Sequence, residues 1–136
     1  MFSKPIAAYQ QIDREADIRG SDPHRLILLL FRGAIAALEK SKLSIAANDI
    51  PGKSQLITQA VAIIQDGLRA SLDLQQGGEL AQNLHALYGY MVTRLISANI
   101  KNDIAAIDEV LKLLGEIGGA WEEIAPPNGA PGAGVR

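Results

Sequence analysis

Apolar residues recur at helical spacing between Gly77 and Asn99, and this pattern constrains the fold more than any other feature of the chain. The apolar positions are Leu80, Leu84, Leu87, Tyr88, Met91 and Leu95. Because an α-helix turns once in about 3.6 residues, these positions share one face and predict an amphipathic helix that packs into a core. Tyr88 and Tyr90 point to different sides of that helix, so at least one of them meets something other than the core seam.

Three other segments have the same periodicity and are bounded by prolines, glycines and asparagines. We expect helices over residues 23–47, 49–72, 78–99 and 103–124. Asp22, Asp49 and Asp103 are placed to cap the first amides of three of them. The segment 75–78 is expected to end the second helix in a tight turn, because glycine readily adopts the left-handed conformation that closes a helix. The sequence therefore predicts an all-α, antiparallel four-helix bundle over residues 21–124.

The two ends of the chain differ from this bundle in composition. In residues 1–20, Phe2, Ile6, Tyr9 and Ile12 have helical spacing, but the charged run at 13–17 interrupts them. We expect a short, mobile N-terminal helix there. Residues 125–136 are mostly proline, glycine and alanine with almost nothing to bury, so this tail is predicted to be disordered.

Composition excludes several classes of protein. The chain has 136 residues, enough for one domain with a real core, and 13 Lys and Arg against 15 Asp and Glu. This balance offers no basic surface for nucleic acid. The longest uninterrupted apolar run, residues 26–31, is far shorter than the roughly 20 residues that span a bilayer. With no cysteine and no signal-peptide pattern, we expect a cytoplasmic protein without membrane insertion.

Residues that could support catalysis or bind metal are scarce. His24 and His85 are far apart in sequence, and neither has the Glu-x-x-His spacing of a di-iron bundle. Ser21 has no base placed beside it by a recognisable motif. We therefore expect no enzyme activity, no cofactor and no metal. His24 is expected to be solvated in the first turn of its helix. His85 is expected to lie at the border between the apolar and the polar face of its helix.

Glycines inside the predicted helices are informative, because each costs about 1 kcal/mol relative to alanine. For Gly33 and Gly67 we expect close approach of two helices. Gly89 lies between Tyr88 and Tyr90, so it could instead leave a shallow place for a partner.

A series of short motifs resembles the FliS family of flagellin-specific export chaperones. The motifs are Ala8-Tyr9, the segment Ser21 to Ile27 with Leu30-Phe31 and Gly33-Ala34, Leu68-Arg69-x-Ser71-Leu72-Asp73, Gly77-Gly78-Glu79, Leu80-Ala81-x-Asn83-Leu84, Leu87-Tyr88-x-Tyr90-Met91, Arg94-Leu95, Ala98-Asn99, Asp103, Glu109-Val110 and Ala120-Trp121. Their order and spacing cover roughly residues 6–124. The chain departs from the family where Arg32 and Gly89 replace a common Asp, where Gly119 replaces an Arg, and near Asp22.

The resemblance implies a chaperone that works without ATP. It would bind the disordered C-terminal segment of flagellin, prevent early polymerisation and help delivery to the flagellar type III export gate. We expect client grooves bordered by Ile6, Tyr9, Leu68, Leu84, Tyr88 and Met91. Ordinary core packing is the alternative for Leu68, Leu84 and Met91. Ile6 and Tyr9 match the family's mobile N-terminal segment, which would cover part of a groove when no client is bound. A helical homodimerisation module without a client is the alternative function.

Overall fold

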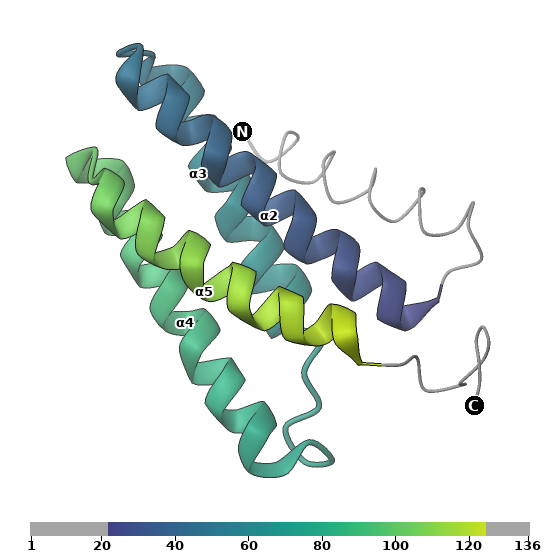
Figure 1. Ribbon diagram of the computed structural model, residues 1–136. Coiled ribbons are helices and arrows are strands. Elements are labelled where there is room, and N and C mark those ends of the chain that lie inside the picture. Colours follow the sequence, from purple (N-terminus) through teal and green to yellow (C-terminus); the bar gives the residue numbers. More distant parts are fainter. Residues whose placement is uncertain (1–21, 125–136) are drawn as a thin grey trace.

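The computed structural model describes residues 22–124, which form a bundle of helices that run antiparallel to their neighbours along the chain (Figure 1). The elements are α2 (Pro23–Ala46), α3 (Ile50–Ala62), the π-helix η1 (Ile63–Arg69), α4 (Gly78–Lys101) and α5 (Ile104–Glu123). Because η1 continues α3 directly, these elements make four helical rods. The prediction of an all-α four-helix bundle is confirmed. The predictions for residues 1–20 and 125–136 lie outside the described residues.

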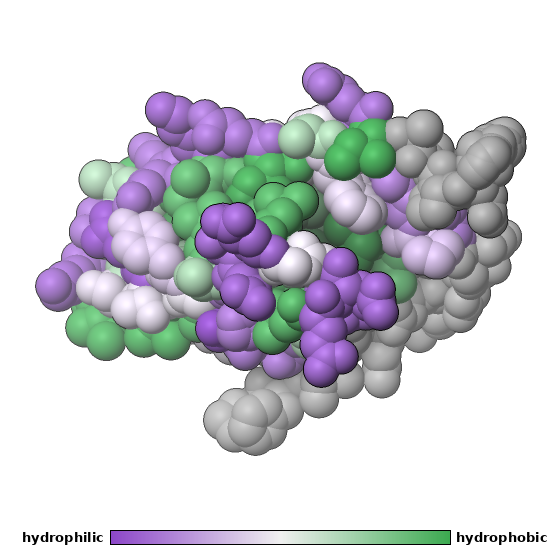
Figure 2. All heavy atoms as spheres, turned by 90° about the horizontal axis from the view of Figure 1, so that it is seen from below, coloured by the Kyte–Doolittle hydropathy of each residue, from purple (hydrophilic) through white to green (hydrophobic). Residues whose placement is uncertain are grey.

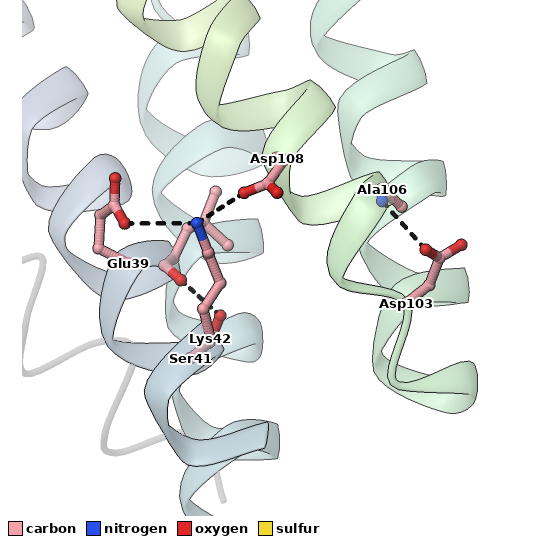
Figure 3. Close-up of polar contacts among 7 residues, drawn as sticks. Glu39, Ser41, Lys42, Asp103, Ala106 and Asp108 are labelled. Atoms are coloured by element: carbon pink, nitrogen blue, oxygen red, sulfur yellow. Dashed lines mark hydrogen bonds and ion pairs between the residues drawn. The ribbon is translucent and has the colours of Figure 1, made fainter. Parts of the chain in front are cut away.

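Aspartate side chains cap three of the helices, as the sequence predicts. Asp22 Oδ1 accepts a hydrogen bond from the His24 amide at 3.0 Å, and Asp49 Oδ1 accepts one from the Gly52 amide at 3.1 Å. Asp103 Oδ1 likewise accepts from the Ala106 amide at 3.1 Å, as Figure 3 shows. Each carboxylate thus satisfies an amide that has no carbonyl partner within its own helix.

The predicted end of the second helix is wrong. The helix stops at Arg69, and residues 70–77 form turns before α4 begins, so the connection is not tight. The Asp73 carboxylate accepts hydrogen bonds from the amides of Gln75 and Gln76, at 3.1 and 3.0 Å. This local bonding of an Asp side chain favours a turn over a helix at residues 73–76. Gly78 has a φ of 58° and opens α4, so the left-handed glycine starts a helix instead of closing one.

A continuous apolar core joins the four helices. α2 packs against α3, η1 and α5, and α4 packs against the same three elements, so α2 lies diagonally opposite α4. The largest fully buried apolar side chains are Leu30, Leu38, Ile57, Ile63, Ile64, Leu68, Met91, Leu95, Ile107, Val110 and Leu114. Between residues 22 and 124, no helix combines the length and the apolar character needed to cross a membrane.

Polar contacts between helices surround this core. The Lys42 ammonium group lies 2.7 Å from Asp108 Oδ1 on α5 and 3.8 Å from Glu39 Oε1 on its own helix (Figure 3). On the other side of α5, Glu109 accepts hydrogen bonds from Tyr90 and Arg94 of α4, at 2.6 and 2.8 Å. These bonds lower the pKa of Glu109, the Tyr90 hydroxyl being the larger cause.

Candidate functional site

An open groove of about 520 Å³ lies at the end of the bundle where α2 and α4 begin and where η1 and α5 end. Its lining comprises Pro23, His24, Leu26, Ile27, Phe31, Leu68, Ser71, Leu72, Asp73, Gly77, Leu80, Ala81, Leu84, Tyr88, Ile117 and Trp121. Figure 2 views the molecule from this end and shows apolar side chains gathered in a hollow with hydrophilic groups around it. All four rods contribute to the groove, so it exists only in the assembled bundle.

The apolar stripe of α4 runs from the rim of the groove to its floor. Leu80 is 68% exposed, Leu84 is half-buried and Tyr88 is only 3% exposed. These residues are one helical turn apart, so they follow one line along the helix. A large aliphatic side chain such as Leu80, left in water at the rim of a concave apolar surface, is typical of a site that binds another apolar group.

Ser71 and Asp73, two polar residues that line the groove, are already used in internal hydrogen bonds. Ser71 Oγ donates to the carbonyl of Leu68 at 2.8 Å, and Asp73 holds the turn described above. Within residues 22–124, no three His, Cys, Asp or Glu side chains are grouped so that they could hold a metal ion. The groove therefore provides apolar contact area and little polar chemistry.

His24 is not solvated, contrary to the prediction from its position in the first turn of α2. It is 9% exposed, and its ring stacks on Trp121 with the ring centroids 4.9 Å apart. His24 Nε2 lies 2.8 Å from the carbonyl oxygen of Trp121, and Trp121 Nε1 donates to the carbonyl of His24 at 2.9 Å. The last turns of α5 meet the first turn of α2 here, and this meeting of segments far apart in sequence buries the imidazole.

The predicted client-binding residues fall into three groups. Leu68, Leu84 and Tyr88 line the groove, although Leu68 and Tyr88 are also members of the core. Met91 is fully buried in the core and does not line the groove. Ile6 and Tyr9 lie outside the described residues. A role in binding stays a prediction for all of them.

Tyr88 and Tyr90 lie on different sides of α4, as their spacing predicts. Tyr90 is 43% exposed and its hydroxyl donates to Glu109. Tyr88 is buried, and this burial raises its pKa to about 12.

Several residues that line the groove are not among the client-binding residues predicted from the sequence. Leu80 belongs to the same stripe as Leu84, so its spacing was the available signal. Phe31 and Trp121 come from helices at opposite ends of the described chain. Only the packing of α2 against α5 brings them to one groove.

The space over Gly89 is occupied by the chain itself. A Cβ atom on Gly89 would lie 2.8 Å from Nη2 and 3.0 Å from Cζ of Arg69. The expected alternative of a shallow place for a partner is therefore wrong, because the Arg69 guanidinium of η1 fills that space. His85 is partly buried, as expected for the border between the apolar and the polar face of α4. Its Nδ1 lies 3.4 Å from Arg69 Nη2.

An all-helical bundle with an open apolar groove at one end is typical of the class of helical binding proteins. Residues 5–128 match the family described as "Flagellar protein FliS". The Salmonella typhimurium flagellar secretion chaperone FliS is 44% identical over 121 residues, which cover 89% of this chain and 90% of that one.

Other relatives agree with this match. The Pseudomonas aeruginosa flagellar secretion chaperone FliSB is 43% identical over 122 residues, which cover 90% of this chain and 96% of that one. The Bacillus subtilis flagellar secretion chaperone FliS is 30% identical over 122 residues, which cover 90% of this chain and 86% of that one. The chain belongs to the FliS family. This membership places it among secretion chaperones and not among enzymes.

Proposed function

We propose that this protein is a flagellar secretion chaperone that binds the disordered C-terminal segment of flagellin in the groove between α2, η1, α4 and α5. The observation that carries the proposal is the half-exposed apolar stripe of α4, which has Leu80 in water at the rim and Leu84 further down. Its FliS relatives are named flagellar secretion chaperones. The chain would act in the cytosol, where it prevents early polymerisation and assists delivery to the flagellar type III export gate.

Apolar burial would supply most of the binding free energy. A client segment that folds into an amphipathic helix lays its apolar face in such a groove and gains about 25 cal/mol per Å² of apolar area removed from water. Ordering the client opposes this gain, so the net affinity is well below the sum of the contacts. The internal use of the Ser71 and Asp73 side chains suits a client recognised by shape and apolarity.

The N-terminal residues have a place in this proposal. Ile6 and Tyr9 belong to the segment that precedes α2, and α2 begins at Pro23 on the wall of the groove. We propose that this segment covers part of the groove when no client is bound and leaves when flagellin enters. Deleting residues 1–20 should then tighten client binding, and unchanged affinity would contradict the covering role.

Titration with a peptide from the C-terminus of the same organism's flagellin tests the main proposal. Calorimetry should give saturable one-to-one binding with a negative heat-capacity change. Trp121 is the single tryptophan of the chain and lines the groove, so its fluorescence should shift to shorter wavelength as the client excludes water. Absence of heat and of any fluorescence change would contradict the proposal. Mass that rises with protein concentration in light scattering would then favour the homodimer.

A pair of leucine substitutions separates the groove from the rest of the surface. Leu80→Glu should weaken peptide binding at least about tenfold, because it places a charge where apolar burial is required. It should change stability little, since Leu80 is 68% exposed. Leu43→Glu is the matched control: Leu43 is 71% exposed and does not line the groove. Equal binding by the two variants would exclude Leu80 from the site.

A further inference from the structure

The π-helix η1 is an unusual element for a wall of this groove. It spans seven residues and continues α3 without a break, whereas π-helices are rare and mostly appear as single turns, frequently at functional sites. Each i→i+5 hydrogen bond spans one more residue than the i→i+4 bond of an α-helix, so a π-turn acts as a one-residue insertion. At 3.6 residues per turn, that extra residue changes the direction of everything after it by roughly 100°.

The groove depends on the register that η1 sets. Leu68 of η1 lines the groove, and so do Ser71, Leu72 and Asp73 in the turn that follows it. Ser71 is tied back to this segment through its amide, which donates to the Gly67 carbonyl, and through its hydroxyl, which donates to the Leu68 carbonyl. If η1 relaxed to an α-helix, Leu68 and the attached turn would rotate away from their present positions. The shape of the groove would change with them.

Arg69, the last residue of η1, connects this element to α4. Its Nη1 donates to Gln65 Oε1 at 3.1 Å, and its Nη2 lies 3.4 Å from His85 Nδ1 on α4. The guanidinium lies against the backbone of Gly89, so a Cβ atom at residue 89 would require it to shift. Arg69 Nε is buried without an acceptor. The polar contacts of the side chain are therefore those of its two terminal nitrogens.

We propose that Arg69 is a positioning residue for the groove: its guanidinium, seated on the bare backbone of Gly89, holds η1 in the π register and thereby keeps Leu68 in the groove wall. This inference rests on the proposed function, since binding of the flagellin segment is its main readout. The space over Gly89 is thus occupied by the chain's own arginine, and not by a partner.

A double-mutant cycle tests this proposal. Arg69→Ala should weaken binding of the flagellin C-terminal peptide about tenfold, because it removes the guanidinium. Gly89→Ala should weaken binding less, because its Cβ displaces the guanidinium without removing it. The double variant should bind no more weakly than Arg69→Ala. Arg69→Lys should not restore binding, since a lysine lacks the planar fork that reaches both Gln65 and His85. Additive losses, or full binding by Gly89→Ala, would overturn the proposal.

Stability supplies a readout that is independent of the client. Alanine favours a helix over glycine, so Gly89→Ala should raise Tm clearly in the Arg69→Ala background. In the presence of Arg69 the same substitution should raise Tm less, or lower it. Gly115→Ala on α5 is the control: its Cβ would meet nothing within 4 Å, so it should raise Tm equally in both backgrounds and leave binding unchanged. Equal changes in Tm for Gly89→Ala in the two backgrounds would contradict the contact between the Arg69 guanidinium and Gly89.

Amide hydrogen exchange separates failure of this inference from failure of the proposed function. In Arg69→Ala the amides of residues 63–69 should exchange faster than in the wild type, while those of α5 stay protected. If the wild type does not bind the peptide, the proposed function fails. Amide exchange and Tm then still test whether Arg69 holds η1 in place. If the wild type binds and the exchange of η1 is unchanged in Arg69→Ala, the positioning role is wrong.

Discussion

Three polar side chains, His24, Ser41 and Lys53, lie buried among the apolar residues of the bundle. Ser41 Oγ donates to the Leu38 carbonyl of its own helix at 2.7 Å, which needs no partner helix. Lys53 reaches from α3 to α4, where its ammonium group donates to the Asn99 carbonyl at 2.6 Å and to Asn102 Oδ1 at 2.7 Å. Since the last carbonyls of a helix have no intrahelical amide partner, Lys53 serves as a cap for the end of α4.

Replacing this buried lysine should be far more costly than replacing an exposed one. Lys53→Ala should lower the free energy of unfolding by about 2–4 kcal/mol, because two oxygens lose a charged donor inside the protein. Lys42→Ala is the control: its ion pairs with Asp108 and Glu39 are on the surface, where solvent screens them, so its loss of stability should be much smaller. Urea denaturation measures both. Similar losses for the two variants would show that the bonds of Lys53 add little.

Ionisation of Tyr88 should lower the free energy of unfolding at alkaline pH. Burial raises its pKa to about 12, above the ordinary value of 10, so the unfolded chain releases the phenolic proton at lower pH than the folded protein does. The contribution of Tyr88 is therefore fully present below pH 10 and is lost as the pH rises from 10 to 12. In Tyr88→Phe, the decline of urea-denaturation midpoints over this range should be smaller. An identical pH profile for the two proteins would contradict the assigned burial.

Local capping and turn chemistry determine where each helix starts and stops. Asp22, Asp49 and Asp103 open three helices, whereas Asp73 opens a turn between η1 and α4. Asn48 and Asn102 follow α2 and α4 with φ values of 58° and 55°, the left-handed conformation in which asparagine is tolerated after a helix. The element boundaries thus follow single polar side chains more closely than they follow hydrophobic periodicity.

The cap of α5 is accessible to a simple test. Asp103→Ala should lower the free energy of unfolding by about 1 kcal/mol, because the Ala106 amide loses its acceptor. Asp103→Asn should cost much less, since asparagine is about as good an N-cap. Thermal and urea denaturation of the two variants measure the difference. If the asparagine variant were as unstable as the alanine variant, charge and not the cap bond would be responsible.

At the scale of the whole molecule, the first and last described helices are joined at the groove end. His24 and Trp121 are 97 residues apart, exchange two hydrogen bonds and stack their rings. The opposite end of the bundle is joined by Lys53 between α3 and α4. Long-range polar contacts therefore secure both ends of an apolar core, and one of these contacts is part of the groove wall.

Loss of the indole donor tests this connection. Trp121→Phe should lower the free energy of unfolding by about 1–2 kcal/mol, because the bond from Nε1 to the His24 carbonyl is lost and the ring becomes smaller. Circular dichroism in urea is the suitable measurement, since the variant has no tryptophan. Unchanged stability would show that the carbonyl of His24 is equally well satisfied by water.

Hydrophobic periodicity predicts the number and order of the helices, and the three Asp caps predict where helices begin. The groove residues Leu84 and Tyr88 follow from one stripe on α4, and Leu68 from its motif. The burial of His24 and the contribution of Phe31 and Trp121 could not be predicted. They depend on the contact between α2 and α5, which are far apart in sequence.

The sequence by itself determined the all-α class, the four helices and their caps, because periodicity and capping are properties of neighbouring residues. Only the tertiary structure decided the π register of η1, the seat of Arg69 on Gly89 and the groove between four rods. These features arise from packing between helices. A residue such as Gly89 has the same local propensity whether its missing side chain faces water, a partner or an arginine of its own chain.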